Sequence, residues 1–414
     1  MSDSETNLLI EPERYEFAAR PIHRFDLQRR DFFKLLGAGI AVFSVAKCAA
    51  GAQETGGARG FRGEETPKDI TSWLHIGEDG KVTVFTGKVE IGQNIRTSLA
   101  QSVADELRVP FDSVTLVMGD TALTPYDMGT FGSRSTPYMT PQLRRAASAA
   151  RDVLVAEATK KWNVAANGLV ARDGKVSEPA SGRSLSYGEL AAGKALARDM
   201  PDADPTTPAA QWTVAGKPQP KVDGRAFVTG KHQYTVDLRP AGMLHGKVLR
   251  APSFLATLVS IDTKAAEAMP GVTVVRDGNF VGVAAPSEGV AAKAIAAMRA
   301  EWKETKQPSG PELFSYLKSN VENGDGNRDK RETGSIDDGL SRAAHRLAQT
   351  YTVAYIAHAP LEPRFQRRVA RVLAAFECGA IVNPDGLRNQ VIGANIMGLG
   401  GALFEAVEFD NGRI

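Results

Sequence analysis

A short loop near residue 90 carries groups that could hold an anionic ligand. Gly92 allows the backbone to approach a ligand closely, and the side chain of Gln93 offers both a hydrogen-bond donor and an acceptor. A helix is expected to begin near Asn94, and its first N–H groups, which lack partners within the helix, would point to the same place. This arrangement suits a phosphate or a carboxylate.

A second loop, residues 129–136, is dense in hydroxyl groups and backbone donors and precedes a predicted helix. Its N–H and O–H groups could satisfy phosphate oxygens, and Arg134 would add positive charge. A loop of Ser, Thr and Gly often does no more than cap the helix that follows it. On residue types alone, ligand binding and simple capping therefore both stay open for each loop.

The composition disfavours several other classes of site. Cys48 and Cys378 are too few for a disulfide framework, a four-thiolate zinc site or an iron–sulfur cluster. The six histidines are scattered, and no phosphate-loop, His-Glu-x-x-His or Gly-x-Ser-x-Gly motif occurs. With 50 Lys and Arg against 48 Asp and Glu, the chain lacks the basic excess of a nucleic-acid-binding protein. We expect no metal held by the chain's own side chains and no nucleic-acid partner.

The elements that must position the two loops predict an α+β protein of two or more domains. The 414 residues exceed the roughly 250–300 at which a single hydrophobic core stops growing. The dipeptide Asp79-Gly80 predicts a hairpin. Hydrophobic periodicity predicts strands at 73–76, 82–85 and 114–118 and helices at 95–107 and 142–162.

The second half of the chain alternates short β-rich runs with helices. Proline-rich breaks at 200–208 and 216–220 predict a domain boundary, and the polar residues 304–334 predict a linker. The expected elements are strands at 233–238, 244–249, 258–261, 272–275, 281–285, 351–356 and 369–376, and helices at 290–302, 335–349 and 387–406.

The start of the chain resembles a twin-arginine export signal. Arg29-Arg30 precede an uncharged apolar stretch at 35–46, and small residues follow. At about 12 residues the stretch is too short to span a membrane, which takes about 20. We expect cleavage near Ala52, a periplasmic protein and no membrane span after cleavage. The alternative is a short amphipathic helix of the mature protein.

Taken together, several segments resemble the xanthine dehydrogenase/aldehyde oxidase family of molybdenum hydroxylases. Residues 89–100, 129–136 and 376–390 are similar to three pterin-contacting loops of that family. Residues 223–237 with 242–252 resemble its α/β hammerhead domain. Because the first loop precedes the hammerhead, the order is permuted, and this order with the leader resembles the isoquinoline 1-oxidoreductase beta-subunit type.

The resemblance implies permuted molybdopterin-binding segments around an α/β hammerhead domain. The implied parts are a twin-arginine signal peptide at 1–52, a tether at 53–68, an N-terminal molybdopterin-binding segment at 69–215, the hammerhead at 216–303, a linker at 304–334, the start of a molybdopterin-binding domain at 335–364 and a partial C-terminal molybdopterin-binding segment at 365–414.

Five residues match the family's cofactor contacts: Gln93, Gly132, Ser133, Ser135 and Gln390. The resemblance implies molybdopterin, the cytosine dinucleotide form being one option, and hydroxylation of an N-heteroaromatic ring or an aldehyde with water as the oxygen source. It also implies an iron–sulfur small subunit as partner, with a cytochrome as one option for the electron acceptor. Asn94 stands where the family usually has glycine.

Two departures concern catalysis. Residues 365–368 lead almost directly to the third loop, without the family's metal-side Gly-Gly-x-Gly-Gly loop. The sequence ends at Ile414, before the Gly-Glu whose glutamate is the family's general base. We therefore assign no catalytic residue and expect little molybdenum and no hydroxylation from this chain. A hydroxylase large-subunit homologue and a non-catalytic remnant or interaction protein both stay open, beside an unrelated exported α+β binding protein.

Overall fold

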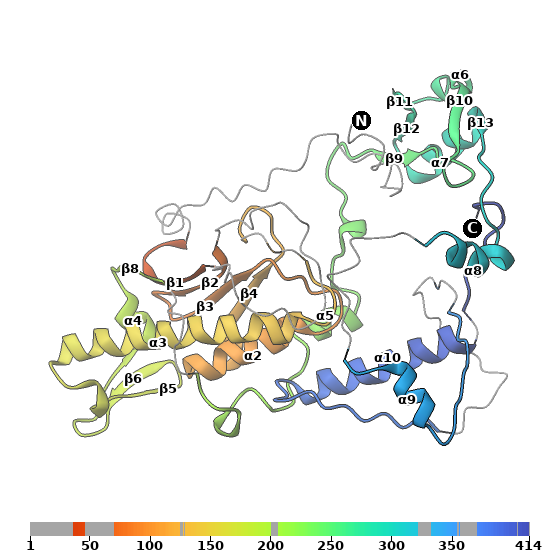
Figure 1. Ribbon diagram of the computed structural model, residues 1–414. Coiled ribbons are helices and arrows are strands. Elements are labelled where there is room, and N and C mark those ends of the chain that lie inside the picture. The colour runs from red at the N-terminus through yellow and green to blue at the C-terminus, as the bar shows by residue number, and fades with distance from the viewer. Residues whose placement is uncertain are drawn as a thin grey trace, which may run out of the picture. The chain divides into compact units, whose positions relative to one another are not determined.

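The computed structural model describes residues 36–45, 70–124, 127, 129–199, 206–321, 333–353, 356, 371–403 and 405–413. The chain forms two compact units (Figure 1). Of the described residues, those up to His232 and those from Arg371 to Ala394 form one, which we call the large-sheet unit. The others, from Gln233 to residue 356 and from Asn395 onward, form the small-sheet unit.

A mixed five-stranded sheet organises the large-sheet unit, in the order β4-β3-β2-β1-β8. The strands are β1 (Gly39–Val45), β2 (Ile70–Gly77), β3 (Val82–Thr86), β4 (Val114–Met118) and β8 (Ala195–Asp199). β2 is antiparallel to β1 and β3, whereas the outer strands β4 and β8 run parallel to their neighbours. The predicted hairpin is confirmed, and its turn is closed by the Gly80 N–H, which donates to the Gly77 carbonyl at 2.9 Å.

Two long helices, α2 (Ile95–Leu107) and α3 (Thr140–Trp162), lie side by side along one side of this sheet (Figure 1). The helix predicted at 95–107 is confirmed, since its apolar residues at spacing four are all buried in the core between α2, α3 and the sheet. The buried face of α3 is largely alanine, which lets it approach its neighbours closely. α2 therefore holds the first loop, which directly precedes it in the chain, against the core.

β1 lies within the apolar stretch that we interpreted as part of an export signal. Ile40, Ala41 and Val42 are completely buried between β2 and β8. Apolar and β-branched residues suit an interior strand that is covered on both faces. The alternative of an amphipathic helix is wrong for residues 39–45, which form a strand.

Several short elements of the large-sheet unit were not predicted. They are β5 (Val170–Arg172), β6 (Lys175–Glu178), β7 (Arg183–Ser186), α4 (Tyr187–Ala191) and α5 (Gly224–Val228). β5, β6 and β7 form an antiparallel three-stranded sheet. A capping box of Ser186 and Glu189 begins α4.

The small-sheet unit contains a three-stranded sheet in the order β11-β12-β9 and a pair of strands, β10 and β13. Its elements are β9 (His245–Val248), β10 (Thr257–Asp262), α6 (Lys264–Glu267), β11 (Thr273–Asp277), β12 (Phe280–Ala285), α7 (Glu288–Ala297) and β13 (Arg299–Lys303). α7 packs against β12 and β9, and α6 packs against α7 and β11, around a small apolar core. The α+β class is confirmed, and the specific hammerhead arrangement stays a prediction.

Three predictions for this unit were wrong in detail. The helix expected at 290–302 ends at Ala297, because Arg299–Lys303 alternate in exposure and pair with β10. Residues 235–237 form a single 3-10 turn rather than a strand. The expected linker contains α8 (Gly310–Ser319).

Near the end of the chain, α9 (Ile336–Arg342) is shorter than predicted, and α10 (Pro384–Leu403) begins and ends about one turn earlier than predicted. Residues 351–353 and 371–376 form no strand; the remainder of those two predicted strands, apart from Ile356, lies outside the described residues.

In the part of the chain that is described, no helix has the length and apolar character needed to cross a membrane.

Candidate functional site

The structure brings the first and second predicted loops together through a buried ion pair. Lys88, just before the first loop, places its Nζ 2.7 Å from Oδ1 of Asp127 and 2.6 Å from the Gly129 carbonyl. The two charged side chains are only 4% and 6% exposed. The Val89 N–H also donates to the Thr130 hydroxyl at 2.9 Å. Since a charge is buried at low cost only when it is paired, this contact fixes the two loops side by side.

The N-terminus of α2 is occupied by a side chain of the loop itself. The Glu90 carboxylate accepts hydrogen bonds from the N–H groups of Gly92 at 2.9 Å, Asn94 at 3.1 Å and Arg96 at 3.0 Å. The Lys221 ammonium lies 2.6 Å from the same carboxylate. The expectation of free N–H groups at this helix end is wrong, because an internal carboxylate already takes the place of an external anion.

Charge and hydrogen bonding favour ionised Glu90. Burial alone would raise the pKa of its carboxyl, but the hydrogen bond from Lys221 and those from the backbone outweigh burial, so the pKa lies below its usual 4.5. Lys221 also lies over the ring of Phe227, with Nζ 5.2 Å from the ring centroid. An external anion would have to displace an ionised, well-bound carboxylate to reach this helix end.

Gln93 holds its own loop. Its Nε2 donates to the Val89 carbonyl at 2.9 Å, and its Oε1 accepts from the Ile91 N–H at 2.7 Å. Asn94, which follows, adopts a left-handed conformation with φ of 67°. Asparagine tolerates this region better than most residues, so the replacement of glycine by asparagine does not prevent the turn.

The second loop is more open than the first. Gly132 and Ser133 have φ of 62° and 56° and are exposed, while Ser135 is 8% exposed. Among the described residues, no hydrogen-bond partner faces the N–H groups of these three residues or the two serine hydroxyls. The loop ends in one π-type turn, Ser135–Met139, before α3. Such turns are frequent at functional sites.

The third segment reaches α2 through an asparagine. Asn383 donates from Nδ2 to Oε1 of Gln101 at 2.8 Å and to the Gln219 carbonyl at 3.2 Å. Its Oδ1 accepts from the Gly386 N–H at 2.7 Å, which orders the start of α10. A Cβ on Gly386 would lie 3.3 Å from Nδ2 of Asn94, so glycine lets α10 approach the first loop.

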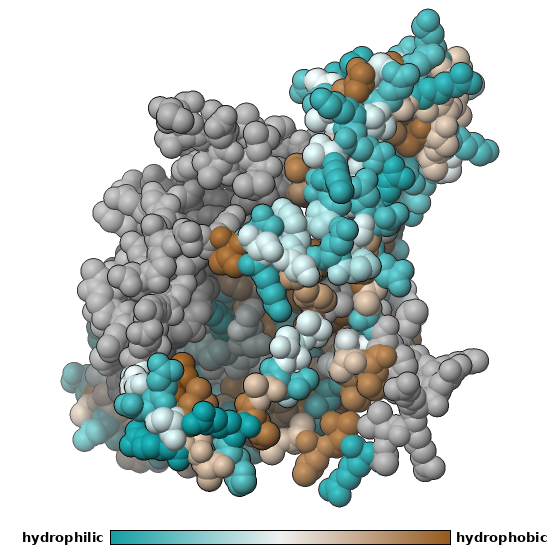
Figure 2. Space-filling view, turned by 45° about the vertical axis from the view of Figure 1, so that its right-hand side comes forward, coloured by the Kyte–Doolittle hydropathy of each residue, from teal (hydrophilic) through white to brown (hydrophobic). Residues whose placement is uncertain are grey.

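Gln390 is exposed on α10, and the described hydrogen bonds do not join it to the first two loops. The same helix exposes Ile392, Ile396 and Met397. On the face shown in Figure 2, hydrophobic residues form several separate patches among hydrophilic ones.

Of the five predicted cofactor contacts, four thus lie on two neighbouring loops, and the fifth, Gln390, lies exposed on α10.

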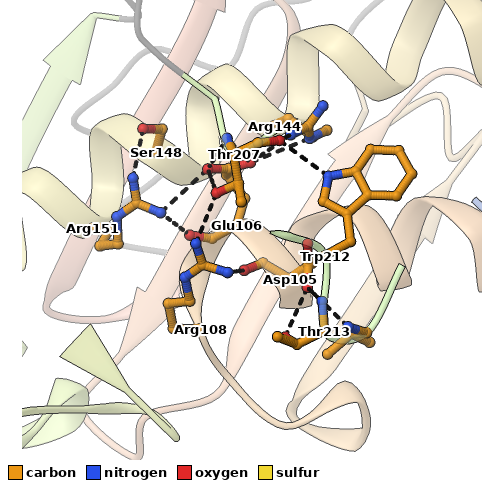
Figure 3. A network of polar contacts seen from close by, with 10 residues as sticks. Asp105, Glu106, Arg108, Arg144, Ser148, Arg151, Thr207, Trp212 and Thr213 are labelled. Atoms are coloured by element: carbon orange, nitrogen blue, oxygen red, sulfur yellow. Dashed lines mark hydrogen bonds and ion pairs between the residues drawn. The ribbon is translucent and has the colours of Figure 1, made fainter. Parts of the chain in front are cut away.

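A buried network of charges fixes the other end of α2 (Figure 3). Glu106, fully buried, accepts from Nε and a terminal nitrogen of Arg144 at 3.2 and 2.9 Å and from Arg151 at 3.2 Å. It also accepts from the Thr207 N–H and hydroxyl. Trp212 lies beside this network, with the Arg144 guanidinium 5.0 Å from the centre of its ring.

Asp105, the neighbour of Glu106, anchors the following segment. Its Oδ1 accepts from the N–H and hydroxyl of Thr213 at 2.6 and 2.9 Å and from the Val214 N–H at 2.8 Å. Arg108 donates to the Asp105 carbonyl at 3.1 Å and to the Thr207 hydroxyl at 2.8 Å. These contacts hold α2, α3 and residues 207–214 as one rigid support for the loops at the opposite end of α2.

Sequence reasoning missed Lys88, Glu90 and Asp127. The available signal was the charge of Lys88 and Glu90 directly beside a predicted strand end, where ionised residues are buried only with partners. Among the described residues, no group of three His, Cys, Asp or Glu side chains is placed to hold a metal ion.

The donors of the second loop suit the phosphate of a pterin cofactor, since Gly132 and Ser133 are exposed residues and, among the described residues, their N–H groups and the Ser135 hydroxyl have no hydrogen-bond partner. The α2 N-terminus does not suit it, because Glu90 already fills that position. Gln93 could contribute only by exchanging its present contacts.

Comparison with known proteins agrees with the sequence resemblance. The molybdopterin cofactor-binding domain family matches residues 13–240 and 256–414. A nicotinate dehydrogenase subunit of Pseudomonas putida is 31% identical over 343 residues, which is 80% of this chain and 28% of that protein. The membrane-bound aldehyde dehydrogenase [pyrroloquinoline-quinone] of Gluconacetobacter polyoxogenes is 27% identical over 354 residues, 81% of this chain and 45% of that protein.

The beta subunit of isoquinoline 1-oxidoreductase from Brevundimonas diminuta is 29% identical over 289 residues, 59% of this chain and 36% of that protein. The chain thus spans less than half the length of the curated relatives that it matches. The family match covers most of the chain, and it includes all three loops whose geometry is described above. This chain therefore belongs to the molybdopterin-binding large subunits of the xanthine dehydrogenase family.

Proposed function

We propose that this chain forms the cofactor-contacting part of a molybdenum hydroxylase that oxidises an N-heteroaromatic ring or an aldehyde with water as the oxygen source. The observation that carries the proposal is the pairing of the two loops through Lys88, which contacts Asp127 and Gly129, and through Val89, which donates to Thr130. This pairing supports a shared site for Gln93 and the open donors of the second loop. The relatives named for nicotinate, isoquinoline and aldehyde oxidation support the substrate classes.

In this proposal the chain's own residues bind and orient the cofactor. Gly132, Ser133 and Ser135 donate hydrogen bonds to the phosphate, or to the pyrophosphate of a cytosine dinucleotide form. Gln93 faces the pterin after exchanging its loop contacts, and Gln390 contributes from α10. When bound, the cofactor supplies the two-electron oxidation of the substrate carbon. The support behind α2 and α3 keeps the donors of the second loop in place, so that of these residues only Gln93 has to exchange its contacts.

The electrons leave through a separate iron–sulfur protein, and we propose a cytochrome as the further acceptor. Two relatives are named as subunits, which supports a multi-subunit enzyme. Two cysteines cannot ligate an iron–sulfur cluster, which takes four protein ligands, and Cys378 is exposed. We also propose export to the periplasm, on the basis of Arg29-Arg30 ahead of the apolar stretch.

A second candidate function, a non-catalytic interaction protein, is favoured by one observation. Glu90 and Gln93 satisfy the first loop internally, so this loop is complete without a ligand. A loop that needs no ligand is what a remnant of the family would retain.

The test is the pterin and molybdenum content of the full-length chain, produced in a host that makes the cofactor. The variant Ser135→Asp places a negative charge among the proposed phosphate donors, and Ser315→Asp, on exposed α8, is the matched control. We expect bound pterin to fall at least about tenfold in the first variant and to stay unchanged in the second, because like charges repel at short range. If the unmodified chain carries no pterin, the interaction protein is the better conclusion.

A further inference from the structure

The apolar stretch that resembles part of an export signal contains an interior strand of the large sheet. β1 pairs along its length with β2, from Gly39 opposite Gly77 to Val45 opposite Ile70. On its other side it pairs with β8, from Gly39 opposite Ala195. Both edges of β1 are therefore hydrogen-bonded within the sheet.

The burial of its side chains also shows that β1 is an integral part of the large sheet. Ile40 and Val42 are 0% exposed and belong to the main core, together with Leu74 and Ile76 of β2. If the segment left, β2 and β8 would each expose an unpaired edge, and the core would lose part of its cover. The sheet is complete only while these seven residues are docked.

An export signal must be accessible to the machinery that recognises it, and a leader removed near Ala52 would take β1 with it. We propose that the folded sheet and the export route compete for Gly39–Val45: docked chains hide the apolar part of the signal, and only chains in which β1 has left the sheet are exported. The proposal rests on the proposed export to the periplasm but not on the hydroxylase function, because it concerns no residue of the cofactor loops.

A substitution at Gly39 separates the role of residues 39–45 as a strand from their role as the apolar part of the proposed signal. A Cβ at Gly39 would lie 2.5 Å from Nε2 of His75 and would also collide with the Ile76 carbonyl. Gly39→Ala should thus push β1 away from β2 while keeping the segment apolar. Gly168→Ala is the matched control, since a Cβ at Gly168 has open space around it.

The first measurement is hydrogen exchange of the purified full-length chain, followed by mass spectrometry of peptides that cover residues 38–45. We expect these amides to exchange at least about 100-fold more slowly than in an unstructured peptide, and Gly39→Ala to remove most of that protection while Gly168→Ala keeps it. Fast exchange in the unmodified chain would overturn the proposal, because β1 would then not be docked in solution.

The second measurement is the fraction of chain recovered in the periplasm, detected by a C-terminal epitope. We expect Gly39→Ala to raise this fraction severalfold over the unmodified chain and over Gly168→Ala. Replacing Arg29 and Arg30 by lysine should abolish the increase, which assigns it to the twin-arginine route. An unchanged fraction in a Gly39→Ala chain that has lost its exchange protection would refute the competition.

Discussion

Removing the buried lysine that joins the two loops should destabilise the large-sheet unit strongly. In Lys88→Met the side chain keeps a similar length but loses its charge, which leaves the Asp127 carboxylate without its partner at 2.7 Å and the Gly129 carbonyl without its donor at 2.6 Å. Both charged side chains are nearly inaccessible to water. Breaking such a pair typically costs about 3–5 kcal/mol, because the remaining charge stays buried and unpaired.

The assay is urea unfolding of the full-length chain, with Trp302→Phe as background so that the fluorescence reports the large-sheet unit through Trp73, Trp162 and Trp212. With a slope of about 1–3 kcal/mol per molar urea, the midpoint should fall by at least about 1 M. Lys81→Met is the matched control, since its ion pair with Asp79 is exposed and should contribute about 0–1 kcal/mol.

A further variant tests the reason for the loss rather than its size. In Lys88→Met with Asp127→Leu no charge remains buried, so this chain should be more stable than Lys88→Met alone. A loss below about 1 kcal/mol for Lys88→Met, or no recovery in the double variant, would refute the claim that a buried charge pair fixes the loops.

Three more outcomes are expected. Glu90→Gln should lower the free energy of unfolding at pH 7 by about 1–3 kcal/mol. Because the pKa of Glu90 is lowered in the folded chain, its carboxylate stabilises the fold only while it is ionised. The difference in stability between the variant and the unmodified chain should therefore shrink on acidification below pH 4.5. Burial lowers the pKa of His75 below 6.5, although Asp79 and a backbone hydrogen bond act in the opposite direction. The unfolded chain therefore binds a proton more readily than the folded chain, and the free energy of unfolding should fall as the pH drops through 6.5. His75→Phe should flatten that dependence in unfolding curves from pH 7.5 to 5.5. Asn383→Ala should cost about 1–3 kcal/mol by urea unfolding, since it leaves Gln101 without its donor, whereas Asn320→Ala, at the exposed residue that follows α8, should cost less than half as much.

The sequence predicted well those helices and turns that depend only on neighbouring residues in the chain. The helix at 95–107 follows from Ile95, Leu99, Val103 and Leu107, which share one face, and the turn at Asp79-Gly80 follows from backbone preferences of two residues. The two candidate loops were identified from residue type, but the sequence did not predict that they lie side by side, which the contacts of Lys88 with Asp127 and Gly129 show.

The wrong or missing predictions concern residues whose secondary structure or contacts depend on partners distant in sequence. Arg299–Lys303 follow a helix but become a strand, because β10 offers an edge some forty residues earlier. Within the apolar stretch 35–46, the alternative of an amphipathic helix was wrong because β2 and β8 pair with residues 39–45 and make them an interior strand. Glu90 was overlooked because its partner Lys221 lies 131 residues away.

The carboxylates at the two ends of α2 meet opposite ends of the helix dipole. Glu90 at the N-terminus is attracted by it, whereas Asp105 and Glu106 in the last turn are repelled. Glu106 must therefore be held by the arginines that surround it, and Arg144 binds it through two nitrogens in a planar fork that lysine cannot reproduce. Exchange of Arg144 for lysine would thus keep a positive charge near Glu106 but lose one of the two contacts, and Arg151 and Thr207 would remain as donors. Removal of Glu106 alone would instead leave two arginines facing each other without their shared carboxylate.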